Sequence, residues 1–256
     1  EKFLFLGAGE AAGGIADLLV EAMMKEGLSQ EEAINGIFLF DSHGLVTKDR
    51  EGLTPLKQKF AHELEPQSTF LDAIGEVKPT AIVGCAAQAG SFNAYVLSAM
   101  ARINERPIIF ALSNPTSRSE CTAREAYTYT EGKCLFASGS PFPQVELNGK
   151  TFIPRQSNNS YVFPGIGLGL VTASPRVVPQ SVFLSAAEAL SKKVSDEDLE
   201  NGSLFPSLTK IREVSQSIAA AVAEECFTAG VAGVPKPKDL SEAIQAAMYK
   251  PVYAQI

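Results

Sequence analysis

The sequence predicts an α/β fold of the doubly wound type: a mainly parallel sheet with helices on both faces, followed by a helical C-terminal extension. Short apolar runs recur along residues 1–160, and helical patterns fill gaps between them. No good strand pattern follows residue 160. Buried apolar runs that alternate with helices are typical of a parallel sheet whose two faces are both covered.

Five apolar runs are short enough to be buried strands of such a sheet. They lie at residues 3–6, 36–41, 79–84, 106–112 and 133–137. Apolar residues at helical spacing predict helices at residues 11–25, 69–77, 92–103, 165–173, 181–192, 208–229 and 240–248. We therefore expect one domain over residues 1–256, with a parallel α/β core at 1–160 and a mostly helical part at 161–256.

The composition indicates a globular protein and excludes several partners. The chain has 256 residues, 45% of them hydrophobic, which is enough to bury a substantial core. Its net charge of −7, without any Lys/Arg run, argues against nucleic acid as a partner. The apolar stretches are too short to span a bilayer, so we expect no membrane partner.

The four cysteines lie far apart and form no Cys-x-x-Cys pair, which is typical of reduced thiols in an intracellular protein. The chain opens on a core strand, so we expect it to be part of a longer chain. A targeting signal would lie upstream, so a cytoplasmic location is the simplest expectation and an organelle stays open.

The first predicted strand runs directly into a glycine-rich turn, in which Leu6 is followed by Gly7-Ala8-Gly9-Glu10-Ala11-Ala12. In this context the first glycine allows a tight turn and the second lets a pyrophosphate approach the backbone at a helix N-terminus. The pattern predicts a Rossmann-type site for a nicotinamide dinucleotide. An ordinary strand-to-helix turn with glycines for packing is the alternative.

The second predicted strand ends at Asp41, where a carboxylate can accept hydrogen bonds from the adenosine ribose. The spacing from Gly9 is longer than usual, and a lengthened connection at residues 27–34 accounts for it. A solvated strand-end Asp41 is the alternative. The next two strands end near small or polar residues that also fit a cofactor path, namely Gly84, Cys85, Ala86, Leu112, Ser113 and Asn114.

Other readings of these residues stay open. Ser113 and Asn114 could simply cap the following helix. Cys85 has no flanking His or Lys and is better explained as a small packing residue. His43 and His62 lack partners at ligand spacing, so we do not expect them to bind metal. The side chains that we expect to have packing roles rather than act as general acids are Tyr127, Tyr129 and Tyr161.

Six segments resemble malic enzymes of the eukaryotic and large bacterial type. They are Gly-Ala-Gly-Glu-Ala-Ala at 7–12, Phe-Asp-Ser-His-Gly-Leu at 40–45, Lys-Pro-Thr-Ala-Ile-Val-Gly at 78–84, Asn-Glu-Arg-Pro-Ile-Ile-Phe-Ala-Leu-Ser-Asn-Pro-Thr-Ser at 104–117, Phe-Ala-Ser-Gly-Ser-Pro-Phe at 136–142 and Asn-Asn-Ser-Tyr-Val-Phe-Pro-Gly at 158–165. The resemblance extends from residue 2 to about residue 253. The segments at 104–117 and 158–165 are the most specific, since we know no other dehydrogenase family with both.

The resemblance implies oxidative decarboxylation of (S)-malate to pyruvate and CO₂, with NAD or NADP as hydride acceptor and Mg²⁺ or Mn²⁺ as Lewis acid. This stretch resembles the cofactor domain, with the 7–12 loop and Asp41 on the dinucleotide. Asn114, Asn158 and Asn159 match asparagines that reach malate or the nicotinamide ribose.

The catalytic Tyr and Lys and the metal-binding carboxylates of that family precede the glycine loop. We therefore expect no catalytic residue or metal ligand in this chain, which should bind cofactor without turning over malate.

Two residues bear on the choice between NAD and NADP. Ser42 follows Asp41, and Lys57 lies downstream; in the resemblance both are typical of NADP-preferring members. Asp41 would repel a 2′-phosphate unless it turned away, so NAD stays possible, and Lys57 could be a solvated surface lysine. The resemblance also implies a homo-oligomer, a dimer or tetramer. A non-catalytic module that senses dinucleotide is the alternative function.

Overall fold

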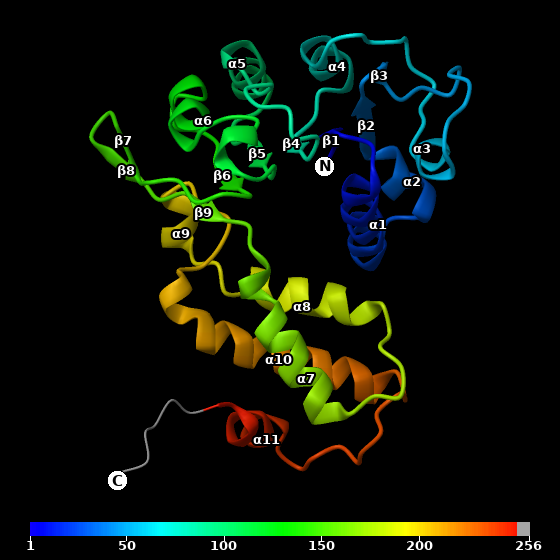
Figure 1. Cartoon of the computed structure of the whole chain (residues 1–256), viewed down its shortest axis with the longest axis vertical. Helices are drawn as coiled ribbons and strands as arrows, with labels where there is room; N and C mark the ends of the chain where they lie inside the picture. Colours follow the sequence, from blue (N-terminus) through cyan, green and yellow to red (C-terminus); the bar gives the residue numbers. More distant parts are fainter. Residues whose placement is uncertain (250–256) are drawn as a thin grey trace. The chain divides into compact units, whose positions relative to one another are not determined.

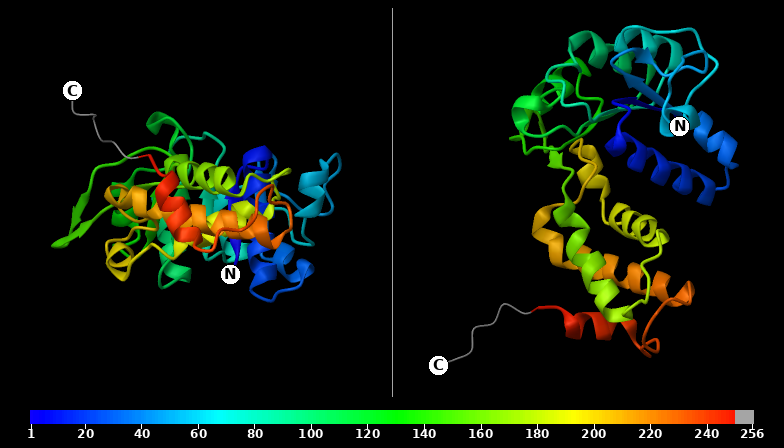
Figure 2. Two further views of the ribbon diagram at one scale, coloured as in Figure 1. Left: turned by 90° about the horizontal axis from the view of Figure 1, so that it is seen from below. Right: turned by 45° about the vertical axis from the view of Figure 1, so that its right-hand side comes forward.

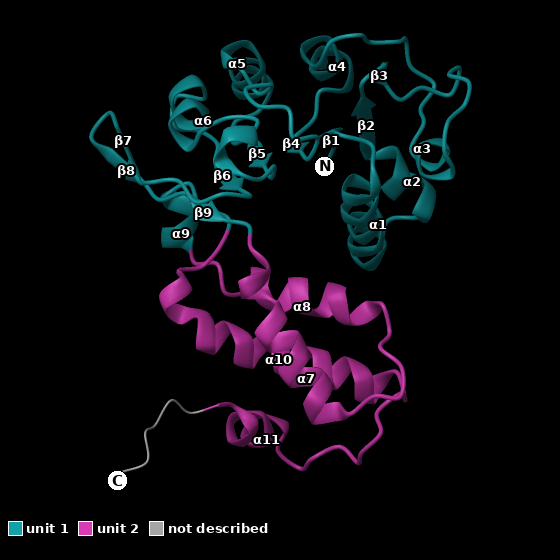
Figure 3. Ribbon diagram, viewed as in Figure 1, with its two compact units in different colours: residues 1–157, 196–204 teal, residues 158–195, 205–256 magenta. Residues whose placement is uncertain are grey.

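The structure is a computed structural model that describes residues 1–249, and it divides the chain into two compact units. Unit 1 comprises residues 1–157 and 196–204, and unit 2 comprises residues 158–195 and the chain from Phe205 onward (Figure 3). Residues 196–204, which follow the predicted boundary near residue 160, belong to unit 1. That the whole chain forms one domain stays a prediction.

Unit 1 is built on a seven-stranded sheet with the order β3-β2-β1-β4-β5-β6-β9 (Figure 1). The five predicted strands are confirmed as parallel neighbours: β1 (Phe3–Leu6), β2 (Ile37–Asp41), β4 (Ala81–Gly84), β5 (Ile108–Ala111) and β6 (Leu135–Ser138). Two-residue edge strands were not predicted, namely antiparallel β3 (Gly44–Leu45) and parallel β9 (Arg155–Gln156). In the central register Leu6 lies beside Phe40 and Gly84, so three strand ends meet at one edge of the sheet.

The two faces of the sheet bury two separate apolar clusters. Leu4 and Leu6 lie in one cluster and Phe5 in the other, because successive strand residues point to opposite faces. The first cluster includes residues of α4 (Phe70–Val77), α5 (Ala94–Ile103) and α6 (Ala123–Tyr129). The second includes residues of α1 (Glu10–Lys25) and α2 (Gln30–Asn35). Helices therefore cover both faces, as predicted.

The predicted helices of unit 1 form with small shifts at their ends. Thr69 and Asn93 lie outside α4 and α5 as N-caps, and their side chains accept hydrogen bonds from first-turn amides. The long connection at residues 27–34 contains most of α2, which Ser29 begins with a capping box. The sequence prediction also missed the short α3 (Pro55–Lys59).

A β-hairpin and a short helix complete unit 1. Strands β7 (Val145–Leu147) and β8 (Lys150–Phe152) pair antiparallel around Asn148-Gly149, both of which have positive φ. Helix α9 (Asp196–Glu200) leads into residues that bind the sheet: the Gly202 carbonyl accepts hydrogen bonds from the Phe136 amide (3.0 Å) and the Tyr127 hydroxyl (3.1 Å). These contacts attach residues 196–204 to unit 1.

Unit 2 is helical, and no strand is assigned within the described residues 161–249. Helix α10 (Ile211–Thr228) packs against α7 (Phe163–Ala173) and α8 (Ser181–Ser191), and α11 (Leu240–Ala247) contacts α7 and α10 (Figure 2). All four predicted helices are present. The one predicted at 208–229 is divided into a 3₁₀ turn at 208–210 and α10. Residues 250–256 of the predicted helical part lie outside the described residues.

Candidate functional site

The turn between β1 and α1 uses its two glycines for different reasons. Gly7 has φ +131°, and a Cβ there would lie 2.8 Å from Cys85 Sγ, so packing alone requires glycine. Gly9 is the N-cap of α1 with φ −98°, no side chain caps the helix, and a Cβ at Gly9 would meet nothing within 4 Å. Packing therefore explains Gly7 but not Gly9, whose missing side chain leaves the helix N-terminus open to an approaching group.

A cleft of about 360 Å³ lies at the carboxyl ends of β1, β2 and β4. Nine of the predicted cofactor residues line it: Leu6, Gly7, Ala8, Gly9, Asp41, Ser42, Lys57, Cys85 and Ala86. The sequence prediction missed Phe40 and Gln88, which also line it. The predicted cofactor residues of unit 1 that lie outside this lining are Glu10, Ala11, Gly84, Leu112, Ser113 and Asn114, and the remaining one, Asn158, belongs to unit 2.

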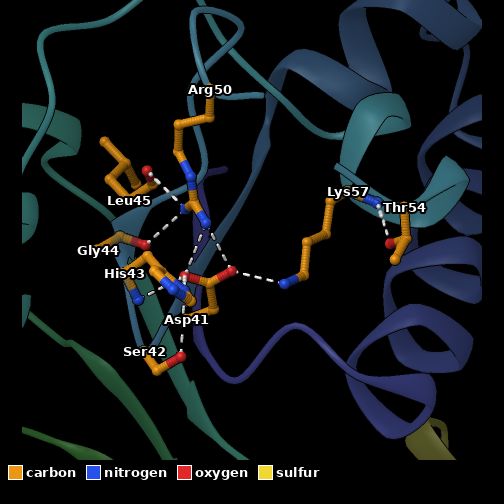
Figure 4. Close-up of polar contacts among 8 residues, drawn as sticks. All are labelled: Asp41, Ser42, His43, Gly44, Leu45, Arg50, Thr54 and Lys57. Carbon is orange, nitrogen blue, oxygen red and sulfur yellow. Dashed lines mark hydrogen bonds and ion pairs between the residues drawn. The ribbon is translucent and has the colours of Figure 1, made fainter. Parts of the chain in front are cut away.

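Asp41 is held by two cations rather than by solvent (Figure 4). Arg50 Nη2 donates to both carboxylate oxygens at 3.1 and 2.9 Å, and Lys57 Nζ lies 2.6 Å from Oδ2. The His43 amide donates to Oδ1 at 2.8 Å, and the Asp41 side chain is 9% exposed. The alternative of a solvated Asp41 is therefore wrong.

These contacts set the charge at the end of β2. Burial alone would raise the pKa of Asp41, but the hydrogen bonds from Arg50 and Lys57 outweigh it and lower the pKa to about 2. The carboxylate is therefore ionised at neutral pH. Together with the two cations it leaves a net charge of +1 beside the cleft.

Local structure places both cations. Lys57 lies on α3, whose N-cap Thr54 accepts the Lys57 amide at 3.4 Å, and its side chain is only 23% exposed. Lys57 is therefore not a solvated surface lysine. Arg50 is braced by the carbonyls of Gly44 and Leu45 at 3.3 and 3.2 Å. The sequence prediction missed Arg50, and the only signal would have been a cation nine residues after a strand-end carboxylate.

Ser113 and Asn114 do not cap a helix. The turn at 116–118 begins after Pro115 without a side-chain cap, and Thr122 caps α6. Ser113 is buried and contacts other loops, whereas Asn114 is exposed and accepts a hydrogen bond from Ser140 Oγ at 2.9 Å. The capping alternative is therefore wrong.

Other predicted residues have packing roles. Burial, together with nearby Glu120, raises the pKa of Cys85 to about 11, so the thiol stays protonated and packs at 3.6 Å from the Leu6 carbonyl. Tyr127 and Tyr161 are buried, as expected for packing side chains, while Tyr129 is 41% exposed. His62 stacks on Phe38, with ring centroids 4.2 Å apart.

Asn158 and Asn159 belong to unit 2. Asn158 is the N-cap of the turn at 159–161, and its Oδ1 accepts the Ser160 amide at 2.9 Å. That these asparagines act together with Asn114 stays a prediction.

Two features are absent from the described residues 1–249. No group of three or more His, Cys, Asp or Glu side chains there is placed to hold a metal ion. None of the helices in that range is both long and apolar enough to cross a membrane.

A mainly parallel sheet covered on both faces, with an open helix N-terminus at the central strand and an acidic residue ending the next strand, defines a Rossmann-type domain of the dinucleotide-binding class. The family model described as "Malic enzyme, NAD binding domain" matches residues 1–227. The chain belongs to this family, as the resemblance in its motifs predicts.

Relatives and solved structures agree with this assignment. A mitochondrial NAD-dependent malic enzyme of Ascaris suum is 47% identical over 100% of this chain and 40% of its own length. An NADP-dependent malic enzyme of Anas platyrhynchos is 49% identical over 98% of this chain and 45% of its own. The crystal structure of Entamoeba histolytica malic enzyme matches 96% of this chain with a TM-score of 0.72 at 22% identity, which supports the fold. The chain spans less than half of the length of the relatives that it matches.

Proposed function

We propose that this chain binds a nicotinamide dinucleotide in the cleft at the ends of β1, β2 and β4. The observation that carries the proposal is the uncapped N-terminus of α1 beneath Gly9, where a Cβ would meet no neighbour. Backbone amides and the helix dipole at such an end suit a pyrophosphate. Asp41 then lies where a dinucleotide presents its adenosine ribose.

We propose NADP as the preferred cofactor. Asp41 alone would repel a 2′-phosphate, but Arg50 and Lys57 both pair with it, and the three groups carry a net charge of +1. Because Arg50 already holds both carboxylate oxygens, Lys57 can turn toward a phosphate without leaving Asp41 unpaired. Ser42, which also lines the cleft, offers a hydroxyl donor.

We propose that the longer protein oxidatively decarboxylates (S)-malate to pyruvate and CO₂. The family assignment and the names of the relatives support this reaction. Asn114, Asn158 and Asn159 would orient the substrate or the nicotinamide ribose through neutral amides. A Mg²⁺ or Mn²⁺ ion would act as Lewis acid in that reaction, and residues 1–249 do not offer a fitting ligand group. We further propose a homo-oligomer that works inside the cell.

Calorimetric titration of NADP and NAD into this chain tests the proposal. We expect saturable binding of both, with the lower Kd for NADP. If neither binds at millimolar concentration, cofactor binding by this chain is wrong. An activity assay of the longer protein distinguishes an enzyme from a non-catalytic module that senses dinucleotide. Mn²⁺-dependent NADPH production from malate supports the enzyme, and cofactor binding without turnover supports the sensor.

A further inference from the structure

Glu120 is a buried carboxyl group that the cofactor contacts proposed above do not use. It is 0% exposed and lies between the turn at 116–118 and α6. None of the ion pairs among the described residues includes it. Burying a carboxyl group is costly unless hydrogen bonds replace its water, so its hydrogen bonds must explain its place in the fold.

Ser113 donates two hydrogen bonds to the Glu120 carboxyl group. Its Oγ donates to Glu120 Oε1, and its backbone amide donates to Oε2 at 3.3 Å. The same Ser113 Oγ accepts a hydrogen bond from the Ala87 amide at 2.8 Å. Glu120 and one serine thus connect the loop after β4, at Ala87, with the loop after β5, at Ser113.

The end of β4 is shaped around the same carboxyl group. A Cβ at Gly84 would lie 2.4 Å from both Cγ and Cδ of Glu120, so any other residue at position 84 would displace it. The Glu120 carbonyl also accepts the Phe92 amide at 3.0 Å, which ties it to the segment before α5. The glycine at position 84 therefore makes room for Glu120. This explains the glycine without any contact between Gly84 and a bound cofactor.

The place of these loops relative to a dinucleotide follows from the order of the strands. With the adenosine ribose at the end of β2 and the pyrophosphate at the N-terminus of α1, the nicotinamide half extends toward the ends of β4 and β5. We propose that Glu120 is a positioning residue for the nicotinamide half, which sets the backbone at Ala87 and Ser113 without touching the cofactor. This inference rests on the proposed function.

The test compares two ligands on the chain and on a Glu120→Gln variant. The ligands are NADP and adenosine 2′,5′-bisphosphate, which is the half of NADP that reaches only β2 and α1. Because glutamine places an amide donor against one of the two Ser113 donors, we expect NADP binding to weaken about tenfold, as for the loss of one hydrogen bond. Binding of the bisphosphate should be unchanged, and hydrogen exchange at the Ala87 amide should accelerate.

Glu125→Gln is the matched control, because Glu125 belongs to the exposed capping box of α6 in the same segment. It should leave both affinities unchanged. If Glu120→Gln does not fold, Ser113→Ala removes the same connection and leaves the buried carboxyl group in place, and the same selective loss is expected.

The positioning role would be overturned if the parent chain binds both ligands and Glu120→Gln either weakens the binding of both equally or leaves NADP binding unchanged. A parent chain that binds neither ligand would instead overturn the proposed function, and this inference with it.

Discussion

At the scale of single residues, the contacts of Asp41 resolve a conflict in the sequence. A carboxylate at the end of the second strand favours a free ribose, whereas Ser42 and Lys57 favour a 2′-phosphate. Arg50 changes the balance, because it pairs with both carboxylate oxygens and leaves Lys57 as an additional cation. We therefore propose that cofactor preference depends on Asp41, Arg50 and Lys57 together rather than on Asp41 alone.

Lys57→Gln should weaken NADP binding about tenfold or more and change NAD binding much less, because it removes one charge-assisted hydrogen bond to the 2′-phosphate. Calorimetric titration of both cofactors measures the change. Lys59→Gln is the matched control, since Lys59 lies on the same helix but pairs with Asp17 at 2.6 Å. Equal weakening of NADP and NAD would contradict the proposed role of Lys57.

Gly9→Ser should separate binding from stability. The serine hydroxyl can cap α1, so the melting temperature should stay unchanged or rise slightly. The same hydroxyl accepts a hydrogen bond from an amide that would otherwise bind the pyrophosphate, and it occupies the space that the pyrophosphate would enter. NADP affinity should therefore fall about tenfold or more. Gly14→Ala, an exposed helix-interior change with no neighbour within 4 Å, is the control that should leave affinity unchanged. Unchanged NADP affinity in Gly9→Ser would speak against a pyrophosphate at this helix end.

The low pKa of Asp41 predicts a pH dependence of stability. A carboxyl group whose pKa falls to about 2 on folding stabilises the fold above its unfolded pKa and loses that contribution as pH falls through the folded pKa. The difference in unfolding free energy between the parent and Asp41→Asn should therefore shrink by on the order of 1–2 kcal/mol between about pH 6 and pH 2. Urea unfolding across this range measures it, and a constant difference would mean that the Arg50 and Lys57 contacts do not stabilise the ionised form.

The local sequence pattern predicted some of these site residues and missed others, and the difference has a physical reason. Gly9 and Asp41 follow directly from strand ends, so their place in the fold is set by the strands themselves. Arg50 and Glu120 lie in loops, and their partners depend on how those loops fold back across the sheet. No periodicity within the sequence encodes such contacts, which is why the pairing of Arg50 with Asp41 emerged only from the structure.

At the scale of elements, the buried central strands were predictable because each is a continuous apolar run. The edge strands β3 and β9 are two residues long, too short to leave a pattern. The β7–β8 hairpin is a different case. Its Asn148-Gly149 turn is a recognised hairpin signal between short strands, so that information was present in the sequence and was overlooked.

Helix α7 offers a test of packing in unit 2. A Cβ at Gly169 would lie 2.7 Å from the Ala219 carbonyl oxygen of α10, whereas a Cβ at Gly167 would meet nothing within 4 Å. Gly169→Ala should therefore destabilise the chain by about 1–3 kcal/mol, and Gly167→Ala should stabilise it by about 0.5–1 kcal/mol through helix propensity. Thermal or urea unfolding measures both. Similar effects of the two changes would contradict the close approach of α7 and α10.

At the scale of the whole molecule, the chain combines an α/β unit that carries the cleft with a helical unit that carries Asn158 and Asn159. It spans only 40–45% of the relatives' length, which is consistent with a domain of a larger enzyme. Cofactor binding is therefore what we propose for this chain. Malate turnover belongs to the proposal for the longer protein.

The most direct test of the central claim is to map the binding site of NADP by amide chemical shifts in the ¹⁵N-labelled chain. We predict that saturating NADP shifts the amides of Gly9, Glu10 and Ala11 most, together with those of Ser42 and Lys57. Gly9, Ser42 and Lys57 line the cleft, and Glu10 and Ala11 begin the helix whose N-terminus would hold the pyrophosphate. Shifts confined to unit 2, or no shift at the N-terminus of α1, would contradict the account.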